Sequence, residues 1–190
     1  MPQKIVMFGD SLTFGYGVLK KDSIEYLLKN KGYDIINSGV NGDNTRNALE
    51  RLEKDVLFYD CDIVTILFGS NDSAPSEYYY VTPFEFKENI KKIIAAIRAK
   101  NKETKIVLIT PPPVDDSVFM PYTTNKRLSK YIEIIREISE EENTLLCDFN
   151  LYLSFYSKGD ISPYLQEDGC HLSEKGYILF ASCILETLSK

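Results

Sequence analysis

The chain contains a single histidine, His171, and a carboxylate lies three residues before it. Both belong to the run Asp168–His171, which also includes Gly169. A carboxylate at this spacing on a glycine-containing loop can fold back and accept the Nδ1–H of the imidazole, which leaves Nε2 free to take up a proton. Such a pair serves as a general base only where a nucleophile lies nearby. The alternative is a solvated loop histidine.

Ser11 is the candidate nucleophile. It follows Gly9 and Asp10 at the end of a strand-like run, and glycine permits a sharp turn from strand to helix. Free backbone N–H groups and the helix dipole at such a turn favour developing negative charge. We predict that Asp10 caps the turn or the helix. The G-x-S-x-G elbow of α/β-hydrolases is absent, because position 13 is Thr13.

Two further strand ends carry groups that could bind an oxyanion. Gly42 follows the second predicted strand, and its N–H could approach a ligand oxygen closely because glycine has no side chain. Asn71 follows the third strand, and its side-chain amide is a neutral donor. Glycines also shape turns and asparagines also cap them, so each residue has a structural explanation when taken singly. These structural explanations do not account for their occurrence together with Ser11 and His171 at corresponding places in the predicted topology.

These residues lie in four short motifs that resemble the sequence blocks of the SGNH (GDSL) hydrolases. Gly9–Leu12 resembles the first block and Gly39–Asp43 the second, while Gly69–Asp72 matches the G-x-N-D block. Asp168–His171 matches the D-x-x-H block. The blocks occur in the family's order and span almost the whole chain. One departure is Leu172, where many family members carry proline; we expect it to alter loop stiffness more than chemistry.

The resemblance implies a role for each residue. Ser11 would be the nucleophile, His171 the general base and Asp168 the residue that orients the histidine. The backbone N–H groups of Ser11 and Gly42 and the side-chain amide of Asn71 would form the oxyanion hole. The resemblance also implies a flavodoxin-like, three-layer α/β/α fold with a five-stranded parallel sheet. Family members include esterases, lipases, thioesterases, lysophospholipases and carbohydrate deacetylases.

We therefore predict a metal-free serine esterase that cleaves a small carboxylic ester or thioester through an acyl-enzyme on Ser11. A carbohydrate O-deacetylase is the alternative, because tyrosines can stack on sugar faces. Five tyrosines lie in predicted rim loops: Tyr78, Tyr79, Tyr80, Tyr156 and Tyr164. Activity on long triglycerides is less expected, since the chain shows neither a lid domain nor an exposed apolar helix. The natural substrate, the acyl chain length, the leaving group and the oligomeric state stay open.

Other residues support competing hypotheses. Cys170 could act as the nucleophile beside His171, but adjacent side chains usually point apart. Asp10, Asp43 and Asp72 follow strand ends and could hold Mg²⁺, whereas one histidine and scattered thiols are a poor set of transition-metal ligands. We expect no metal and no cofactor.

A binding module without hydrolase activity is a hypothesis of another class. A flavodoxin-like domain could hold FMN or a phosphate in the loop 11–17, since helix N-termini bind phosphates. A catalytically silent protein-binding domain is a further possibility. Neither hypothesis accounts for Asp168, His171 and Asn71.

Short apolar runs alternate with longer helical ones, which is the signature of βαβ units and a parallel sheet. The predicted strands are Lys4–Phe8, Asp34–Asn37, Asp62–Phe68, Lys105–Thr110 and Thr144–Asp148. Apolar spacing of three and four residues predicts helices over Phe86–Ile97, Leu128–Ile138 and Tyr177–Leu188, with shorter ones at Ile24–Lys31 and Thr45–Asp55. Three segments are expected to be irregular: Ser73–Thr82, Pro111–Thr123 and Asn150–Cys170.

Length and composition limit the remaining possibilities. The 190 residues fit one domain over residues 1–190, and 44% apolar with 26% charged residues is typical of globular proteins. A net charge of −6 without a basic cluster argues against nucleic-acid partners. No apolar run approaches the ~20 residues of a membrane span, and no signal peptide precedes the first strand, so we expect a cytoplasmic protein. Its four cysteines are expected to be reduced.

Overall fold

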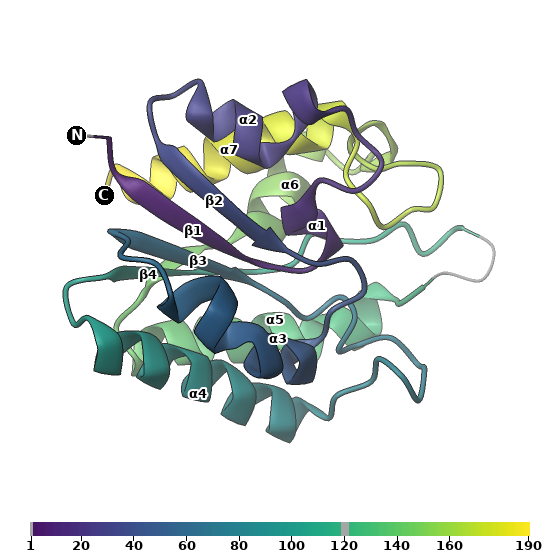
Figure 1. The fold of residues 1–190 in the computed structure, drawn as a ribbon. Coiled ribbons are helices and arrows are strands. Elements are labelled where there is room, and N and C mark those ends of the chain that lie inside the picture. The colour runs from purple at the N-terminus through teal and green to yellow at the C-terminus, as the bar shows by residue number, and fades with distance from the viewer. Residues whose placement is uncertain (1, 119–121) are drawn as a thin grey trace.

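Five parallel strands form the central sheet. The computed structural model describes residues 2–118 and 122–190 of the chain (Figure 1). The strands are β1 (Lys4–Gly9), β2 (Asp34–Gly39), β3 (Ile63–Leu67), β4 (Lys105–Ile109) and β5 (Leu145–Cys147). They pair in the order β2-β1-β3-β4-β5, and each pairing is parallel. The predicted five-stranded parallel sheet is confirmed.

Helices connect the strands. In the described part of the chain they are α1 (Ser11–Phe14), α2 (Ile24–Lys29), α3 (Thr45–Leu52), α4 (Pro83–Lys100), α5 (Asn125–Glu141), α6 (Phe149–Ser157) and α7 (Glu174–Leu188). The predicted helix over Thr45–Asp55 is divided, because α3 ends at Leu52 and a π-helical turn continues over Glu53–Leu57. Short 3-10 turns lie at Lys20–Asp22 and Ser162–Tyr164.

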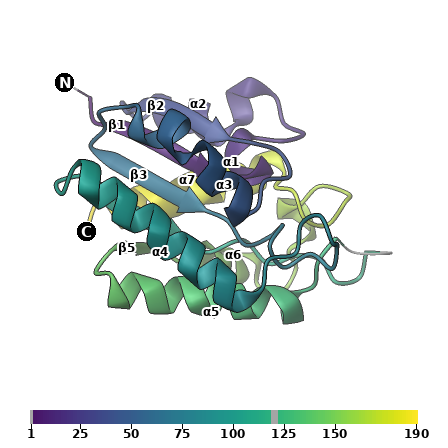
Figure 2. The ribbon, with the colours of Figure 1, turned by 60° about the horizontal axis from the view of Figure 1, so that its bottom comes forward.

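The helices cover both faces of the sheet and produce three layers (Figures 1 and 2). Side chains of β1 alternate between the two layers. Ile5 and Met7 pack with α2, α6 and α7 on one face, whereas Val6 and Phe8 pack with α3, α4 and α5 on the other. All four side chains are fully buried. Strands covered on both faces are largely apolar, which is why the sequence shows short runs that are apolar nearly throughout. The α/β/α architecture is confirmed.

Helix α6 differs from the prediction, which made Asn150–Cys170 irregular. Its buried face carries residues four positions apart: Phe149, Leu153 and Ser157. The opposite face is also apolar, with Leu151 61% and Phe155 74% exposed. Apolar residues on both faces hide the helical period in the sequence. The expectation that no apolar helix is exposed is wrong for the same reason.

The loops at the carboxyl ends of the strands gather at one edge of the sheet. The chain leaves β1 toward β2 on one side and leaves β3 toward β4 on the other, so the topological switch point of the sheet lies between β1 and β3. Ser73–Thr82 contains no helix or strand, as predicted. The same is true of residues 111–118 and 122–123, while 119–121 of that predicted loop lie outside the described residues. Among the helices that are described, none is long and apolar enough to cross a membrane.

Candidate active site

Ser11, His171 and Asp168 form a continuous chain of hydrogen bonds at the switch point. Ser11 is the first residue of α1, and its Oγ lies 2.9 Å from Nε2 of His171. Nδ1 of the same ring lies 2.6 Å from Oδ2 of Asp168. An ionised carboxylate only accepts hydrogen bonds, so Nδ1 carries the proton and Nε2 turns a lone pair toward the serine hydroxyl. The fold thus brings together residues 160 positions apart.

The backbone of its own loop holds Asp168 in place. Its Oδ1 accepts the N–H groups of Cys170 and His171, each at 2.9 Å. Gly169 makes this turn possible, since its φ of +71° lies in the region that favours glycine. Burial acts to raise the pKa of Asp168, but these hydrogen bonds and the imidazole outweigh it and hold the pKa below its ordinary value. Asp168 is therefore ionised at neutral pH.

The predicted oxyanion donors lie on the same cavity as Ser11. This cavity has a volume of 490 Å³, and Gly42, Asn71 and the Ser11–His171–Asp168 chain all line it. Gly42 has a φ of +81°, so its N–H orientation depends on a conformation that other residues adopt at a cost. Asn71 is 4% exposed and donates from Nδ2 to the backbone oxygen of Asp43 at 2.8 Å. All five residues predicted for the site are therefore brought together.

Three tyrosines form an aromatic wall of the cavity. The Tyr16 ring centroid lies 4.4 Å from that of His171, and the Tyr79 and Tyr122 rings meet edge to face at 5.7 Å. The Tyr122 hydroxyl also donates to Oδ1 of Asn71 at 2.8 Å. Of the five tyrosines predicted for the rim, only Tyr79 lines this cavity in the described part of the chain. Tyr16 and Tyr122 were not predicted, because no local pattern marks them.

Cys170 lies closer to His171 than predicted. Its Sγ is 3.5 Å from Nδ1 of His171, so the expectation that the two side chains point apart is wrong. The thiol lies on the Nδ1 side of the ring, where Asp168 already binds. Burial, together with the charge of Asp168, raises the pKa of Cys170 to about 12. The thiol is therefore protonated at neutral pH and lacks the thiolate character of a nucleophilic cysteine.

Two carboxylates near Ser11 have partners within the protein. Asp10 caps α1, as predicted, because its Oδ1 accepts the N–H of Leu12 at 2.9 Å. Burial raises the pKa of Asp10 to about 7; the N–H of Leu12 opposes this shift and the nearby carboxylates add to it. Asp43 forms an ion pair with Arg51 at 2.5 Å. The Mg²⁺ hypothesis draws no support from these contacts.

Arg51 of α3 joins the turn before the nucleophile to the loop after β2. Its guanidinium donates to the backbone oxygen of Gly9 at 2.9 Å and to that of Ser38 at 2.8 Å. It also binds Asp43, the neighbour of the predicted oxyanion glycine, and lies over the Phe8 ring at 4.5 Å. One largely buried cation therefore connects the end of β1, the end of β2 and the loop after β2. The sequence did not predict this role, because a buried arginine on an amphipathic helix cannot be told from a solvent-exposed one by sequence pattern.

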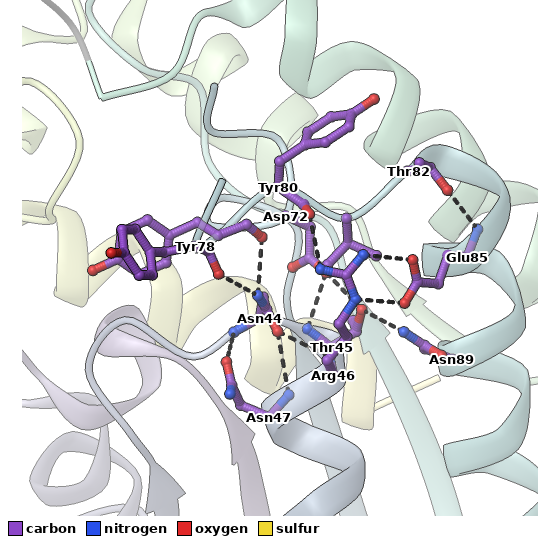
Figure 3. Close-up of polar contacts among 12 residues, drawn as sticks. Asn44, Thr45, Arg46, Asn47, Asp72, Tyr78, Tyr80, Thr82, Glu85 and Asn89 are labelled. Atoms are coloured by element: carbon purple, nitrogen blue, oxygen red, sulfur yellow. Dashed lines mark hydrogen bonds and ion pairs between the residues drawn. The ribbon is translucent and has the colours of Figure 1, made fainter. Parts of the chain in front are cut away.

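The N-terminus of α3 anchors the loop that carries Tyr79 (Figure 3). Asn44 donates from Nδ2 to the backbone oxygen of Tyr79 at 2.9 Å. Arg46 donates to the backbone oxygen of Tyr80 at 3.0 Å and binds both carboxylate oxygens of Glu85, at 2.5 and 2.6 Å. The aromatic wall is therefore supported from the helix behind it.

Asp72 links the end of β3 to the same helix. Its Oδ1 accepts the N–H of Thr45 at 2.9 Å and the Thr45 hydroxyl at 2.6 Å (Figure 3). Burial raises the pKa of Asp72 to about 6, although these two hydrogen bonds oppose the shift. Asp72, one of the three carboxylates of the Mg²⁺ hypothesis, thus has hydrogen-bond partners within the protein.

Comparison with known proteins adds independent support. The sequence pattern of the GDSL-like lipase/acylhydrolase family matches residues 7–179. A GDSL esterase/lipase from Arabidopsis thaliana is 30% identical over 207 positions, which cover 93% of this chain and 81% of that protein. An acetylxylan esterase from Geobacillus stearothermophilus is 24% identical, covering 98% and 94%. The crystal structure of a lipase/acylhydrolase from Enterococcus faecalis superposes with a TM-score of 0.84 at 31% identity, covering 98% and 95%. The chain therefore belongs to the GDSL-like lipase/acylhydrolase family of carboxylic ester hydrolases.

Proposed function

We propose that the protein is a metal-free serine esterase that cleaves a small carboxylic ester or thioester through an acyl-enzyme on Ser11. One observation carries the proposal: the hydrogen-bonded chain in which Ser11 Oγ lies 2.9 Å from Nε2 of His171 and Nδ1 lies 2.6 Å from Asp168. Family membership supports ester hydrolysis as the reaction class, and this chain supplies a nucleophile, a base and an orienting carboxylate.

Acylation begins when Ser11 Oγ attacks the ester carbonyl carbon while Nε2 of His171 takes the hydroxyl proton. The carbonyl oxygen becomes an oxyanion, which the N–H groups of Ser11 and Gly42 and one Nδ2–H of Asn71 would stabilise. His171 then protonates the departing alcohol or thiol. In the second half-reaction, the same histidine takes a proton from water, whose oxygen attacks the acyl carbon. The bond between that carbon and Ser11 Oγ then breaks, the acid leaves, and His171 returns the proton to Oγ.

Turnover of p-nitrophenyl acetate, butyrate, octanoate and palmitate by wild type and Ser11→Ala, with EDTA present, tests the proposal. We expect Ser11→Ala and His171→Ala each to reduce kcat by about 10⁴-fold or more. Ser182→Ala on α7 serves as the control, because its hydroxyl donates to the backbone oxygen of Ile178 in the same helix and has no other hydrogen-bond partner among residues 2–118 and 122–190. The preferred chain length measures the acyl pocket.

Wild-type turnover by His171→Ala would overturn the proposed base, since the chain has no second histidine. Turnover that survives Ser11→Ala but is lost on treatment with iodoacetamide would assign the nucleophile to a cysteine. A yellow protein that binds FMN and shows no turnover dependent on Ser11 would favour the binding module instead.

A carbohydrate O-deacetylase is the second candidate, and the aromatic wall favours it. Tyr16, Tyr79 and Tyr122 face the cavity, and tyrosine rings stack on sugar faces. The similarity to an acetylxylan esterase is consistent with this substrate class. Acetate release from an acetylated xylo-oligosaccharide with a kcat/KM at least 10 times that for p-nitrophenyl butyrate would favour the deacetylase. The reverse ratio would favour the simple esterase.

A further inference from the structure

The side-chain amide of Asn71 is held at both of its ends. Nδ2 donates to the backbone oxygen of Asp43 at 2.8 Å and lies 3.3 Å from Oδ2 of Asp10. Oδ1 accepts the hydroxyl of Tyr122 at 2.8 Å. The side chain is 4% exposed, so water has little access to replace either contact.

These contacts select one of the two orientations of the amide. The terminal torsion of asparagine is broad and roughly two-fold, so the amide has no strong internal preference. The backbone oxygen of Asp43 only accepts a hydrogen bond, and it therefore selects Nδ2 at that end. The Tyr122 hydroxyl donates to Oδ1 in this orientation and so holds the other end of the amide. In the flipped orientation Oδ1 would face the backbone oxygen of Asp43 with no hydrogen between them, and the Tyr122 hydroxyl would have to accept instead of donate.

Tyr122 is itself fixed independently of Asn71. Thr123, the next residue, is buried, and its Oγ1 lies 2.8 Å from Oγ of Ser73. The Tyr122 ring packs edge to face on Tyr79. Burial raises the pKa of Tyr122, so its hydroxyl keeps its proton and stays a donor. Contacts other than the one to Asn71 therefore hold Tyr122 in place, and its hydroxyl can restrain the Asn71 amide.

We propose that Tyr122 is a positioning residue for the oxyanion hole, which acts by holding the Asn71 amide with Nδ2–H toward the reacting carbonyl. This inference rests on the proposed function, in which Asn71 is one of three oxyanion donors. One Nδ2 hydrogen is engaged by the backbone oxygen of Asp43, and the other is directed to Oδ2 of Asp10 at the longer distance of 3.3 Å. An oxyanion would take over this second, more weakly held hydrogen. The direction of this N–H bond matters most in the transition state, when the oxyanion forms, so the loss of the Tyr122 hydroxyl should affect kcat more than KM.

The test is Tyr122→Phe, which keeps the ring and removes only the hydroxyl. With p-nitrophenyl butyrate we expect kcat to fall roughly tenfold with KM within about twofold, since one hydrogen bond to the positioned group is lost. The Ki for phenylboronic acid, which forms a tetrahedral adduct with the serine, should rise by a similar factor. Tyr152→Phe is the control, because it loses a 2.6 Å hydroxyl contact to Glu186 outside the cavity and should keep wild-type kcat.

A double-mutant cycle with Asn71→Ala separates positioning from direct action. If Tyr122 acts through Asn71, Tyr122→Phe lowers kcat roughly tenfold in wild type and not at all in the Asn71→Ala background. A loss that persists in that background, or an unchanged kcat in the single variant with an unchanged melting temperature, would overturn the inference. Failure of the proposed function has a different signature, namely turnover that survives Ser11→Ala.

Discussion

Asp168 uses its two carboxylate oxygens for different tasks. Oδ1 holds the loop by accepting two backbone N–H groups, while Oδ2 receives Nδ1–H of His171. In Asp168→Asn the oxygen can still hold the loop, but an NH₂ group then faces Nδ1 and favours the tautomer with the proton on Nε2. We expect kcat to fall by about 10²–10⁴-fold with a melting temperature close to wild type. A kcat near wild type, measured on the same ester, would show that His171 needs no orienting carboxylate.

Asp10 links the site to the pH dependence of stability. Its pKa is about 7 in the folded protein, raised by burial, and the ordinary value of 3.8 applies to the unfolded chain. Between pH 4 and 7 the folded state binds the additional proton, so this group lowers stability by about 1.4 kcal/mol for each unit of rising pH. Asp10→Asn lacks this contribution.

We therefore expect the stability of Asp10→Asn relative to wild type to increase by about 2–3 kcal/mol from pH 5 to pH 8. Urea denaturation of both proteins at the two pH values measures this difference. A difference that is the same at both values would mean that Asp10 is ionised throughout in the folded protein.

Residue types and order were enough to predict the five residues of the site, all of which line the cavity, because each lies in a recognisable motif. Ser11, Gly42 and Asn71 follow strand ends, whereas Asp168 and His171 lie in the loop before α7. The groups that support them were not predictable in the same way. Arg51 and Tyr122 act through contacts with backbone and side chains distant in the sequence. Cys170 shows the opposite error, since its approach to His171 depends on the bend of a turn that sequence spacing does not describe.

At the scale of elements, the start of α3 performs two tasks through one side chain. Asn44 caps the helix by accepting the N–H groups of Arg46 and Asn47, and it also donates to the loop that carries Tyr79. We expect Asn44→Ala to lower stability by about 1–2 kcal/mol and to raise KM several-fold, because the cap and the aromatic wall loosen together. Chemical denaturation and steady-state kinetics give the two quantities.

Asn47→Ala is the matched control for this prediction. Asn47 completes the capping box by accepting the N–H of Asn44 at 3.2 Å, but no hydrogen bond connects its side chain to the tyrosine loop in the described part of the chain. It should lower stability less and leave KM unchanged. Equal effects of the two variants on KM would show that the helix cap alone supports the wall.

Helices and strands were predictable from the sequence wherever the apolar residues follow a single clear pattern. Each predicted strand agrees with the structure to within two residues. The central strands β1, β3 and β4 are buried on both faces and therefore give largely apolar runs. Helix α6 was missed because its exposed face is apolar as well. Loop conformation is a different problem: the course of Ser73–Thr82 depends on contacts with α3 that no local pattern contains.

At the scale of the molecule, two apolar layers enclose the sheet, and α6 completes one of them. Phe149 is fully buried, with its ring centroid 4.7 Å from that of Phe180 on α7. We expect Phe149→Ala to lower the free energy of unfolding by about 3–5 kcal/mol. Phe155→Ala removes the same side chain from the same helix, but Phe155 is 74% exposed, so a change within about 0.5 kcal/mol is expected. Similar losses in the two variants, measured by urea denaturation, would contradict the layer assignment.

Because the strands are parallel, the start of β1 and the end of α7 lie at the opposite edge of the sheet from the cavity. The cavity lies where β1 ends, whereas β1 begins at the far edge of the sheet. Helix α7 starts three residues after His171 and runs back about 22 Å. Leu188 at its end lines the same surface cavity as Lys105, the first residue of β4. A resin or a carrier protein attached before β1 or after α7 would therefore lie at the edge of the sheet that is distant from the cavity. We expect the cavity of the immobilised enzyme to stay accessible to bulky esters carried on polymers.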